Sequence, residues 1–166
     1  MAAFYIFDAP VGPIGILEDG CAVTGVWFGS NPPPDAERKE TEISRCAALQ
    51  LREYFAGKRR VFTVPLAPAG TPFQRCVWSR LLTIPYGETR SYGDVARGIG
   101  NTRACRAVGM ANHRNPVPIF IPCHRVVGAD GSLTGYGGGI RIKETLLRLE
   151  GIPVTDGKIG KGSTSC

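Results

Sequence analysis

The stretch NPVPIFIPCHRVVG, residues 115–128, carries the features on which the prediction of fold and function depends. A run of apolar residues ends at Pro122, and Cys123 and His124 follow it directly. Because a proline disfavours helical backbone in the residue before it, residues 117–121 are predicted to form a buried β-strand that ends at Cys123. Neighbouring side chains point to opposite faces of a strand, so a direct hydrogen bond between Cys123 and His124 is not expected.

A cysteine thiol has an ordinary pKa of about 8.5, so it needs a base or a positive field to form thiolate at neutral pH. His124 could be that base through a turn or one water, provided that another group orients its far nitrogen. Glu150 is a candidate for this group, because it lies at the predicted end of a helix, where the macrodipole disfavours negative charge. The alternative is a buried and inert Cys123, the commoner role of a free thiol.

Composition limits the class of protein. With 166 residues, of which 43% are hydrophobic, the chain can form one compact domain or two small ones. The longest apolar runs are far shorter than the ~20 residues of a membrane helix, and the N-terminus lacks the basic flank of a secretory signal. We therefore expect a cytoplasmic protein without membrane association. Its six cysteines are expected to be reduced, and its two histidines and cysteine spacing predict no metal site.

The positive charge is unevenly distributed. Lys and Arg number seven against eight Asp and Glu in residues 1–68, but eleven against five in residues 69–152. A polyanionic partner of the second segment is one interpretation of this excess. A merely basic, solvated surface is the other.

The first part of the chain, residues 1–68, is predicted to be a small α/β domain. Residues 4–28 contain short apolar runs separated by Pro, Gly and Asp, which is typical of strands in an antiparallel sheet. From Asp35 the apolar residues follow helical spacing up to Gly57. A linker at residues 64–70 then leads to the second part.

Residues 69–154 are predicted to form a mostly helical domain. Thr71 with Gln74 and Ser91 with Asp94 have capping-box spacing and predict two helix starts. A third helix over 103–112, capped by Thr102, would complete a helix-turn-helix with a winged-helix-like arrangement. A last helix is predicted over 140–149, with Gly151 just beyond it, and residues 155–166 are expected to be a flexible tail.

The third predicted helix is rich in small residues, among them Ala104, Ala107 and Gly109. Small side chains allow close approach of another helix or of nucleic acid. Arg103 and Arg106 on the same helix favour contact with phosphates and bases, although tight helix packing remains the alternative.

The pattern as a whole resembles the O6-alkylguanine-DNA alkyltransferases, the methylated-DNA–protein-cysteine methyltransferases. The resemblance covers about residues 71–151. Its motifs are Phe73-Gln74, Val77-Trp78, 84–88, Ser91-Tyr92, 106–109, 115–119, 122–126, 135–138, Lys143-Glu144, Leu146-Leu147 and Glu150-Gly151. Residues 1–70 fit the variable N-terminal part of this family, expected to be ribonuclease-H-like, only loosely.

The resemblance implies transfer of an alkyl group from O6 of a damaged guanine to Cys123, in a single turnover and after the base has flipped out of the duplex. His124 would then be a water-mediated base oriented by Glu150. Tyr92 would help to rotate the nucleotide, and Asn115 would support the active-site segment through backbone hydrogen bonds. No cofactor is implied, and no zinc is expected, because residues 1–70 contain no histidine.

The implied partner is double-stranded DNA that contains O6-alkylguanine, bound by a monomer, with cooperative binding left open. Arg106 would fill the gap in the base stack, and the second helix of the helix-turn-helix would enter the minor groove. The residues expected to let this helix approach DNA are Ala104, Ala107 and Gly109. Those expected to form the pocket for the flipped base are Val126, Tyr136, Gly137 and Gly138.

Three other functions are compatible with parts of the pattern. A non-catalytic alkylation-damage binder would lack the cysteine, which is present here. A cysteine hydrolase would use Cys123 and His124, but leaves the helix-turn-helix and basic excess without a purpose. A transcription factor that senses alkylation would need a further DNA-binding domain.

Overall fold

The structure, a computed structural model, describes residues 2–136 and 138–160. The chain divides into two compact units. The first comprises Met1–Ala69 together with Pro116–Phe120, and the second comprises Gly70–Asn115 and Ile121–Cys166. The sequence analysis predicted one continuous domain over residues 69–154. In the structure, the segment Pro116–Phe120 before the cysteine belongs instead with the N-terminal unit.

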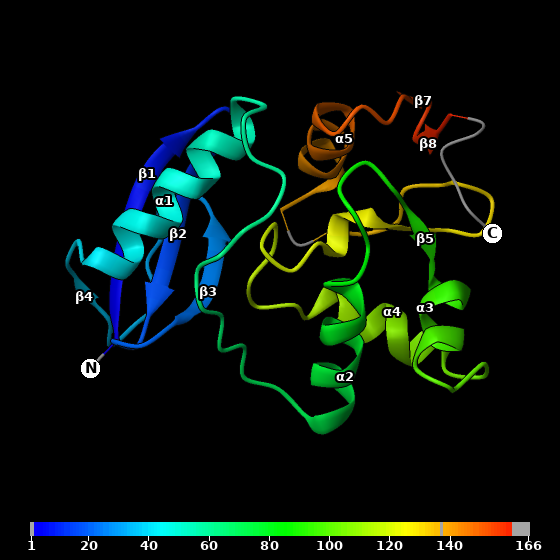
Figure 1. The fold of residues 1–166 in the computed structure, drawn as a ribbon, viewed down its shortest axis with the longest axis horizontal. Helices are drawn as coiled ribbons and strands as arrows, with labels where there is room; N and C mark the ends of the chain where they lie inside the picture. The colour runs from blue at the N-terminus through cyan, green and yellow to red at the C-terminus, as the bar shows by residue number, and fades with distance from the viewer. Residues whose placement is uncertain (1, 137, 161–166) are drawn as a thin grey trace. The chain divides into compact units, whose positions relative to one another are not determined.

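The first unit is a four-stranded sheet covered on one face by a helix (Figure 1). Its strand order is β3-β2-β1-β4. The elements are β1 (Ala3–Ala9), β2 (Gly12–Glu18), β3 (Val23–Phe28), β4 (Glu37–Arg38) and α1 (Glu42–Phe55). The first three strands are antiparallel, as predicted, whereas the short β4 pairs parallel to β1. The helix begins at Glu42, later than the sequence pattern indicated, because residues near Asp35 form the edge strand.

A glycine allows an indole ring to lie across this sheet. Gly15 of β2 pairs with Trp27 of β3, and a Cβ atom at Gly15 would lie 2.1 Å from the Trp27 ring. The ring of Phe4 in β1 lies 6.0 Å from that of Trp27. Any larger residue at position 15 would therefore displace the indole.

The predicted strand over residues 117–121 is wrong. The segment is buried, but Ile119 has φ 74°, a conformation in which a β-branched residue is rare and which ends a strand. Tertiary packing holds it: Pro116 accepts a hydrogen bond from the Val26 amide at 2.8 Å, and the Phe120 ring lies 4.7 Å from Phe62. Burial in the first unit therefore explains the apolar run without a strand.

Over its described residues, the second unit contains five short helical segments and small pairs of strands. They are α2 (Pro72–Leu81), β5 (Arg90–Ser91), α3 (Tyr92–Gly98), α4 (Cys105–His113), the 3-10 helix η1 (Cys123–Arg125), β6 (Val126–Val127), α5 (Ile140–Leu149), β7 (Val154–Thr155) and β8 (Lys158–Ile159). Both predicted capping boxes are present, at Thr71 and at Ser91. The predicted α5 has the observed bounds.

The helices α3 and α4 form the predicted helix-turn-helix. They pack against each other, and Gly100 in the turn has φ 77°. The predicted cap at Thr102 is wrong: α4 begins at Cys105, and its N-cap residue Ala104 makes no side-chain capping bond. Strand β5, which directly precedes α3, pairs with β6, which directly follows η1. This pairing connects α3 to the segment that follows Cys123.

Residues 155–160 are not a loose tail. Strands β7 and β8 form a hairpin around Asp156 and Gly157, both with positive φ. Ile152, Val154 and Leu147 form a small apolar cluster against which Ile159 packs. Burial of this cluster therefore orders the start of the predicted tail.

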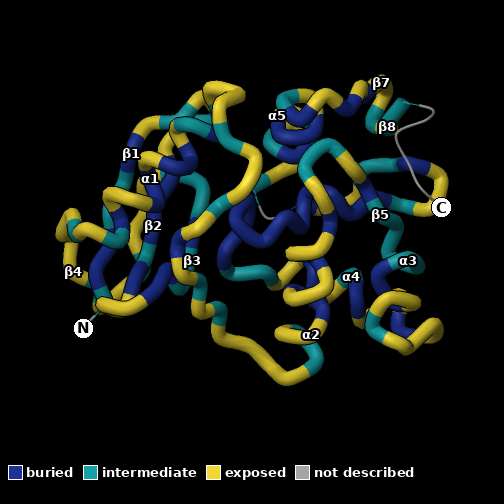
Figure 2. The backbone as a smooth tube through the Cα atoms, viewed as in Figure 1, coloured by how far each residue is buried: buried dark blue, intermediate teal, exposed yellow. Residues whose placement is uncertain are grey.

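Figure 2 shows that the tube between α4 and β6 is buried almost throughout its length. In the portion of the chain that is described, no helix has the length and hydropathy needed to cross a membrane.

Candidate active site

The buried Cys123 opens the 3-10 helix η1 and lies wholly within the second unit. Two asparagine amides hold its backbone in place. Asn112 of α4 donates to the carbonyl of Cys123 at 3.3 Å, and Asn115 donates to the carbonyl of Ile121 at 2.9 Å. The predicted support of this segment by Asn115 through a backbone hydrogen bond thus has its counterpart in the structure.

His124 and Glu150 are in direct contact, although they are far apart in sequence. Nε2 of His124 lies 2.6 Å from Oε2 of Glu150, and both side chains are fully buried. Nε of Arg125 donates to Oε1 of Glu150 at 2.8 Å, and the Gly87 amide donates to the same oxygen at 3.0 Å. The carboxylate at the end of α5 thus has a positive partner that offsets the unfavourable helix dipole.

These contacts set the protonation states of the pair. Burial would raise the pKa of Glu150, but the His124 ring and the Arg125 guanidinium outweigh it and hold that pKa well below its usual range. Burial lowers the pKa of His124, and the charges of Arg125 and Lys143 lower it further against the opposing effect of Glu150. At neutral pH the pair is therefore an ionised carboxylate and a neutral imidazole.

The tautomer of His124 follows from this arrangement. A neutral imidazole carries one N–H, and the carboxylate accepts the proton of Nε2. Nδ1 is then the acceptor nitrogen, and it is buried without a hydrogen-bond partner among the described residues. The site therefore contains a basic nitrogen that is oriented and available to take a proton.

The thiol of Cys123 is subject to opposing effects. Burial raises its pKa, while hydrogen bonding with Asn115, the charge of Lys143 and hydrogen bonding with Tyr136 each lower it. The raised pKa means that little thiolate exists at neutral pH without help. Proton removal by a base is therefore needed for the sulfur to react.

Lys143 is a part of this site that the sequence interpretation did not assign. It is fully buried, and its ammonium group donates to the carbonyls of Val126 at 2.7 Å and Thr134 at 3.3 Å. Burial lowers its pKa to about 8. A signal was present in the sequence, because Lys143, Leu146, Leu147 and Glu150 have the i, i+3, i+4, i+7 spacing of one helix face. Arg125 was also missed, although it adjoins the Cys-His pair.

Of the residues expected to bind a base, Val126 directly follows η1, and hydrogen bonding with Tyr136 lowers the pKa of the Cys123 thiol. Val126 and Tyr136 are buried, Gly138 is partly buried, and Gly137 lies outside the described residues. The hydroxyl of the half-buried Tyr92 is hydrogen-bonded to that of Thr134. Burial raises the pKa of Tyr92, against the opposing effect of Thr134, so its hydroxyl stays protonated at neutral pH.

The candidate DNA-binding residues of α4 divide into two groups. Arg106 and Ala107 are exposed. Ala104 is buried, and Gly109 faces the ring of Tyr92, which a Cβ atom there would meet at 3.8 Å. The exposed Arg106 and Ala107 can meet a partner, whereas Ala104 is buried within the unit; a Cβ atom at Gly109 would make only an ordinary van der Waals contact with Tyr92.

Fold and site together define a class: a helix-turn-helix protein with a buried cysteine, followed in sequence by a histidine that contacts a buried glutamate. Residues 72–152 match the model of the family described as 6-O-methylguanine DNA methyltransferase, DNA binding domain. The methylated-DNA–protein-cysteine methyltransferase of Methanosarcina acetivorans is 51% identical over 89% of this chain and 97% of its own length. The constitutive enzyme of Bacillus subtilis is 46% identical, over 87% and 93% of the two chains.

Solved structures agree with this result. A crystal structure of Mycobacterium tuberculosis OGT in complex with DNA superposes with a TM-score of 0.84 at 47% identity, and covers 89% of this chain and 92% of that one. The chain belongs to the methylated-DNA–protein-cysteine methyltransferase family. The family resemblance and the α/β fold with a helix-turn-helix are thereby confirmed.

Proposed function

We propose that this chain repairs DNA by transferring the alkyl group of O6-alkylguanine to the sulfur of Cys123. The observation that carries the proposal is the buried contact between Glu150 and His124, the residue that follows Cys123, in the same unit as the helix-turn-helix. The names of the relatives and the DNA complex of the Mycobacterium tuberculosis protein support it.

In the proposed reaction, Nδ1 of His124 takes the thiol proton of Cys123 through one water. The sulfur then attacks the alkyl carbon, so that a C–S bond forms while the C–O6 bond breaks. The electron pair of that bond returns to the guanine, which takes up a proton and is restored. The imidazolium that forms is stabilised by the carboxylate of Glu150.

The same proposal assigns the remaining residues. Arg106 enters the base stack in place of the flipped nucleotide, Tyr92 assists its rotation, and Val126, Tyr136, Gly137 and Gly138 form the pocket. The neutral thioether product is a poor leaving group, so each molecule reacts once. We place the protein in the cytoplasm, where its thiol stays reduced and DNA is accessible.

Mass spectrometry of the protein mixed with a duplex that contains one O6-methylguanine tests the proposal. The expected result is one added methyl group, mapped to Cys123, and no further addition with excess lesion. An undamaged duplex is the control. An unchanged mass with the lesion still in the DNA would contradict the proposal and favour a damage-binding protein.

A Lys143→Met variant tests the contribution of the buried cation to the thiol. Because the charge of Lys143 lowers the pKa of Cys123, its removal should slow single-turnover methyl transfer at neutral pH. The pKa of Lys143 is about 8, so the wild type loses this charge as pH rises through that value. The difference between variant and wild type should therefore be largest below pH 8 and shrink above it.

The measurement is the single-turnover rate of methyl transfer across this pH range, with thermal unfolding as a check that the variant folds. A variant that is equally slow at every pH would argue for a structural role of Lys143 alone.

A further inference from the structure

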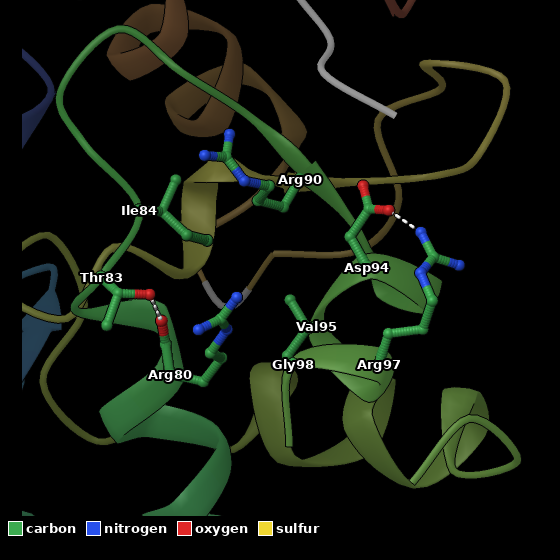
Figure 3. A pocket seen from close by; sticks show the side chains of 8 residues that line it. All are labelled: Arg80, Thr83, Ile84, Arg90, Asp94, Val95, Arg97 and Gly98. Carbon is green, nitrogen blue, oxygen red and sulfur yellow. Dashed lines mark hydrogen bonds and ion pairs between the residues drawn. The ribbon is translucent and has the colours of Figure 1, made fainter. Parts of the chain in front are cut away.

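The second unit has a pocket of about 600 Å³ between α2, β5 and α3 (Figure 3). Three arginines and one aspartate are among its lining residues: Arg80 of α2, Arg90 of β5, and Arg97 and Asp94 of α3. None of its eight lining residues is aromatic. The pocket therefore has the charge for an anion but no ring on which a base could stack.

The three arginines differ in how far their charge is already compensated. Arg97 forms an ion pair with Asp94. Arg90 forms another with Glu88, in which Nη2 lies 3.1 Å from Oε1. Arg80 has no ion-pair partner among the described residues. An anion in the pocket would thus meet one uncompensated guanidinium and two partly compensated ones. The planar fork of guanidinium donors matches phosphate oxygens.

A glycine leaves room for the uncompensated group. A Cβ atom at Gly98, the last residue of α3, would lie 2.2 Å from Nε of Arg80. The guanidinium therefore lies close to the helix backbone at Gly98, and a larger residue there would displace this exposed side chain from its place.

The three arginines that line the pocket lie on elements other than α4. The ring of Tyr92 lies beside Gly109 of α4. At about 100° per residue, Asp94 and Gly98 are separated around the axis of α3 from Tyr92 by about 160° and about 120°. The pocket adjoins the network of Glu150, because the carbonyl of Ile84, one of its lining residues, accepts a hydrogen bond from Nη1 of Arg125 at 2.7 Å.

We propose that Arg80, Arg90 and Arg97 form a second phosphate-binding site, which holds a backbone phosphate of DNA outside the segment bound at α4. The identification of the phosphate as one of DNA rests on the proposed function. It agrees with the concentration of positive charge in residues 69–152. Without a stacking ring, the site would bind the backbone independently of sequence.

The test is the salt dependence of binding to a long undamaged duplex, measured by fluorescence anisotropy. Arg80→Gln should lower the slope of log affinity against log salt concentration by about 0.9, the value for one lost phosphate contact. Gly98→Ala keeps every charge but pushes Arg80 from its place, and should lower the slope similarly. Arg45→Gln, which removes an exposed arginine of the first unit, is the matched control and should leave the slope unchanged.

Three outcomes would overturn the proposal: an unchanged slope in Arg80→Gln, a wild-type slope in Gly98→Ala, or an equal loss in Arg45→Gln. Inorganic phosphate, followed by NMR at the Arg80 Nε–H signal, distinguishes the source of the anion. Phosphate binding together with an unchanged slope in Arg80→Gln would mean a site for a free anion and not for DNA. Methyl transfer should be unchanged in Arg45→Gln, and its absence in the wild type would refute the proposed function without touching the slope result.

Discussion

Replacement of Cys123 by serine should abolish methyl transfer while DNA binding persists. A serine hydroxyl holds its proton far more tightly than a thiol, and its oxygen is a weaker nucleophile towards an alkyl carbon. His124 is a neutral imidazole in a buried site, so it cannot compensate for this difference. Loss of the nucleophile should lower the single-turnover rate by at least about 10⁴-fold.

The measurement is the methyl content of the protein after incubation with an O6-methylguanine duplex, together with the affinity for that duplex. Cys76→Ser is the control, because Cys76 is an exposed thiol of the same unit. It should react at the wild-type rate. Methyl transfer to another cysteine in the Cys123→Ser variant would show that the sulfur of Cys123 is not the acceptor.

The second large effect is expected for Glu150→Gln, in both stability and rate. The carboxylate accepts hydrogen bonds from Arg125, the Gly87 amide and Nε2 of His124. A glutamine amide must direct its two N–H donors at one of these groups and leaves the buried Arg125 without a counter-charge. Breaking a buried pair in this way costs about 3–5 kcal/mol of unfolding free energy.

The rate should fall for a related reason. If the amide donates to Nε2 of His124, the imidazole proton moves to Nδ1, and the acceptor nitrogen for the thiol proton is lost. Loss of an oriented general base typically slows a reaction by about 10²–10⁴-fold. Urea unfolding and single-turnover transfer measure the two effects separately.

Glu144→Gln is the matched control on the same helix. Glu144 forms a 3.6 Å ion pair with Arg148, whose side chain is more than half exposed. Because exposed ion pairs contribute little, the change should alter the free energy of unfolding by no more than about 1 kcal/mol. Equal effects of the two substitutions would contradict the special role of Glu150.

The pH dependence of stability provides a further check on Glu150. Its pKa is lower in the folded protein than the ordinary value of 4.5. Its contribution is therefore fully present above pH 4.5 and is lost as pH falls towards the folded pKa. The stability difference between wild type and Glu150→Gln should narrow over that acidic range.

Sequence reasoning succeeded where a short segment contains its own signal. Each capping box joins residues three positions apart, and the apolar face of α5 repeats every three or four residues. Both features could therefore be predicted from the sequence. It was wrong for residues 117–121 and for the cap at Thr102. In the first case an apolar run was buried by packing against the first unit instead of by strand pairing.

The sequence by itself therefore determined the strands of the first unit, the helix-turn-helix, the position of α5 and the Cys-His motif. The sequence had suggested Glu150 as the group that orients His124, and the tertiary structure shows their contact. Only the tertiary structure decided that Arg125 neutralises this carboxylate and that the charge of Lys143 acts on the thiol. The physical reason is distance along the chain. The pairs with Glu150 join residues 25 and 26 positions apart, and such contacts leave no periodicity in the sequence. Their partners and protonation states follow from burial, which is a property of the folded chain.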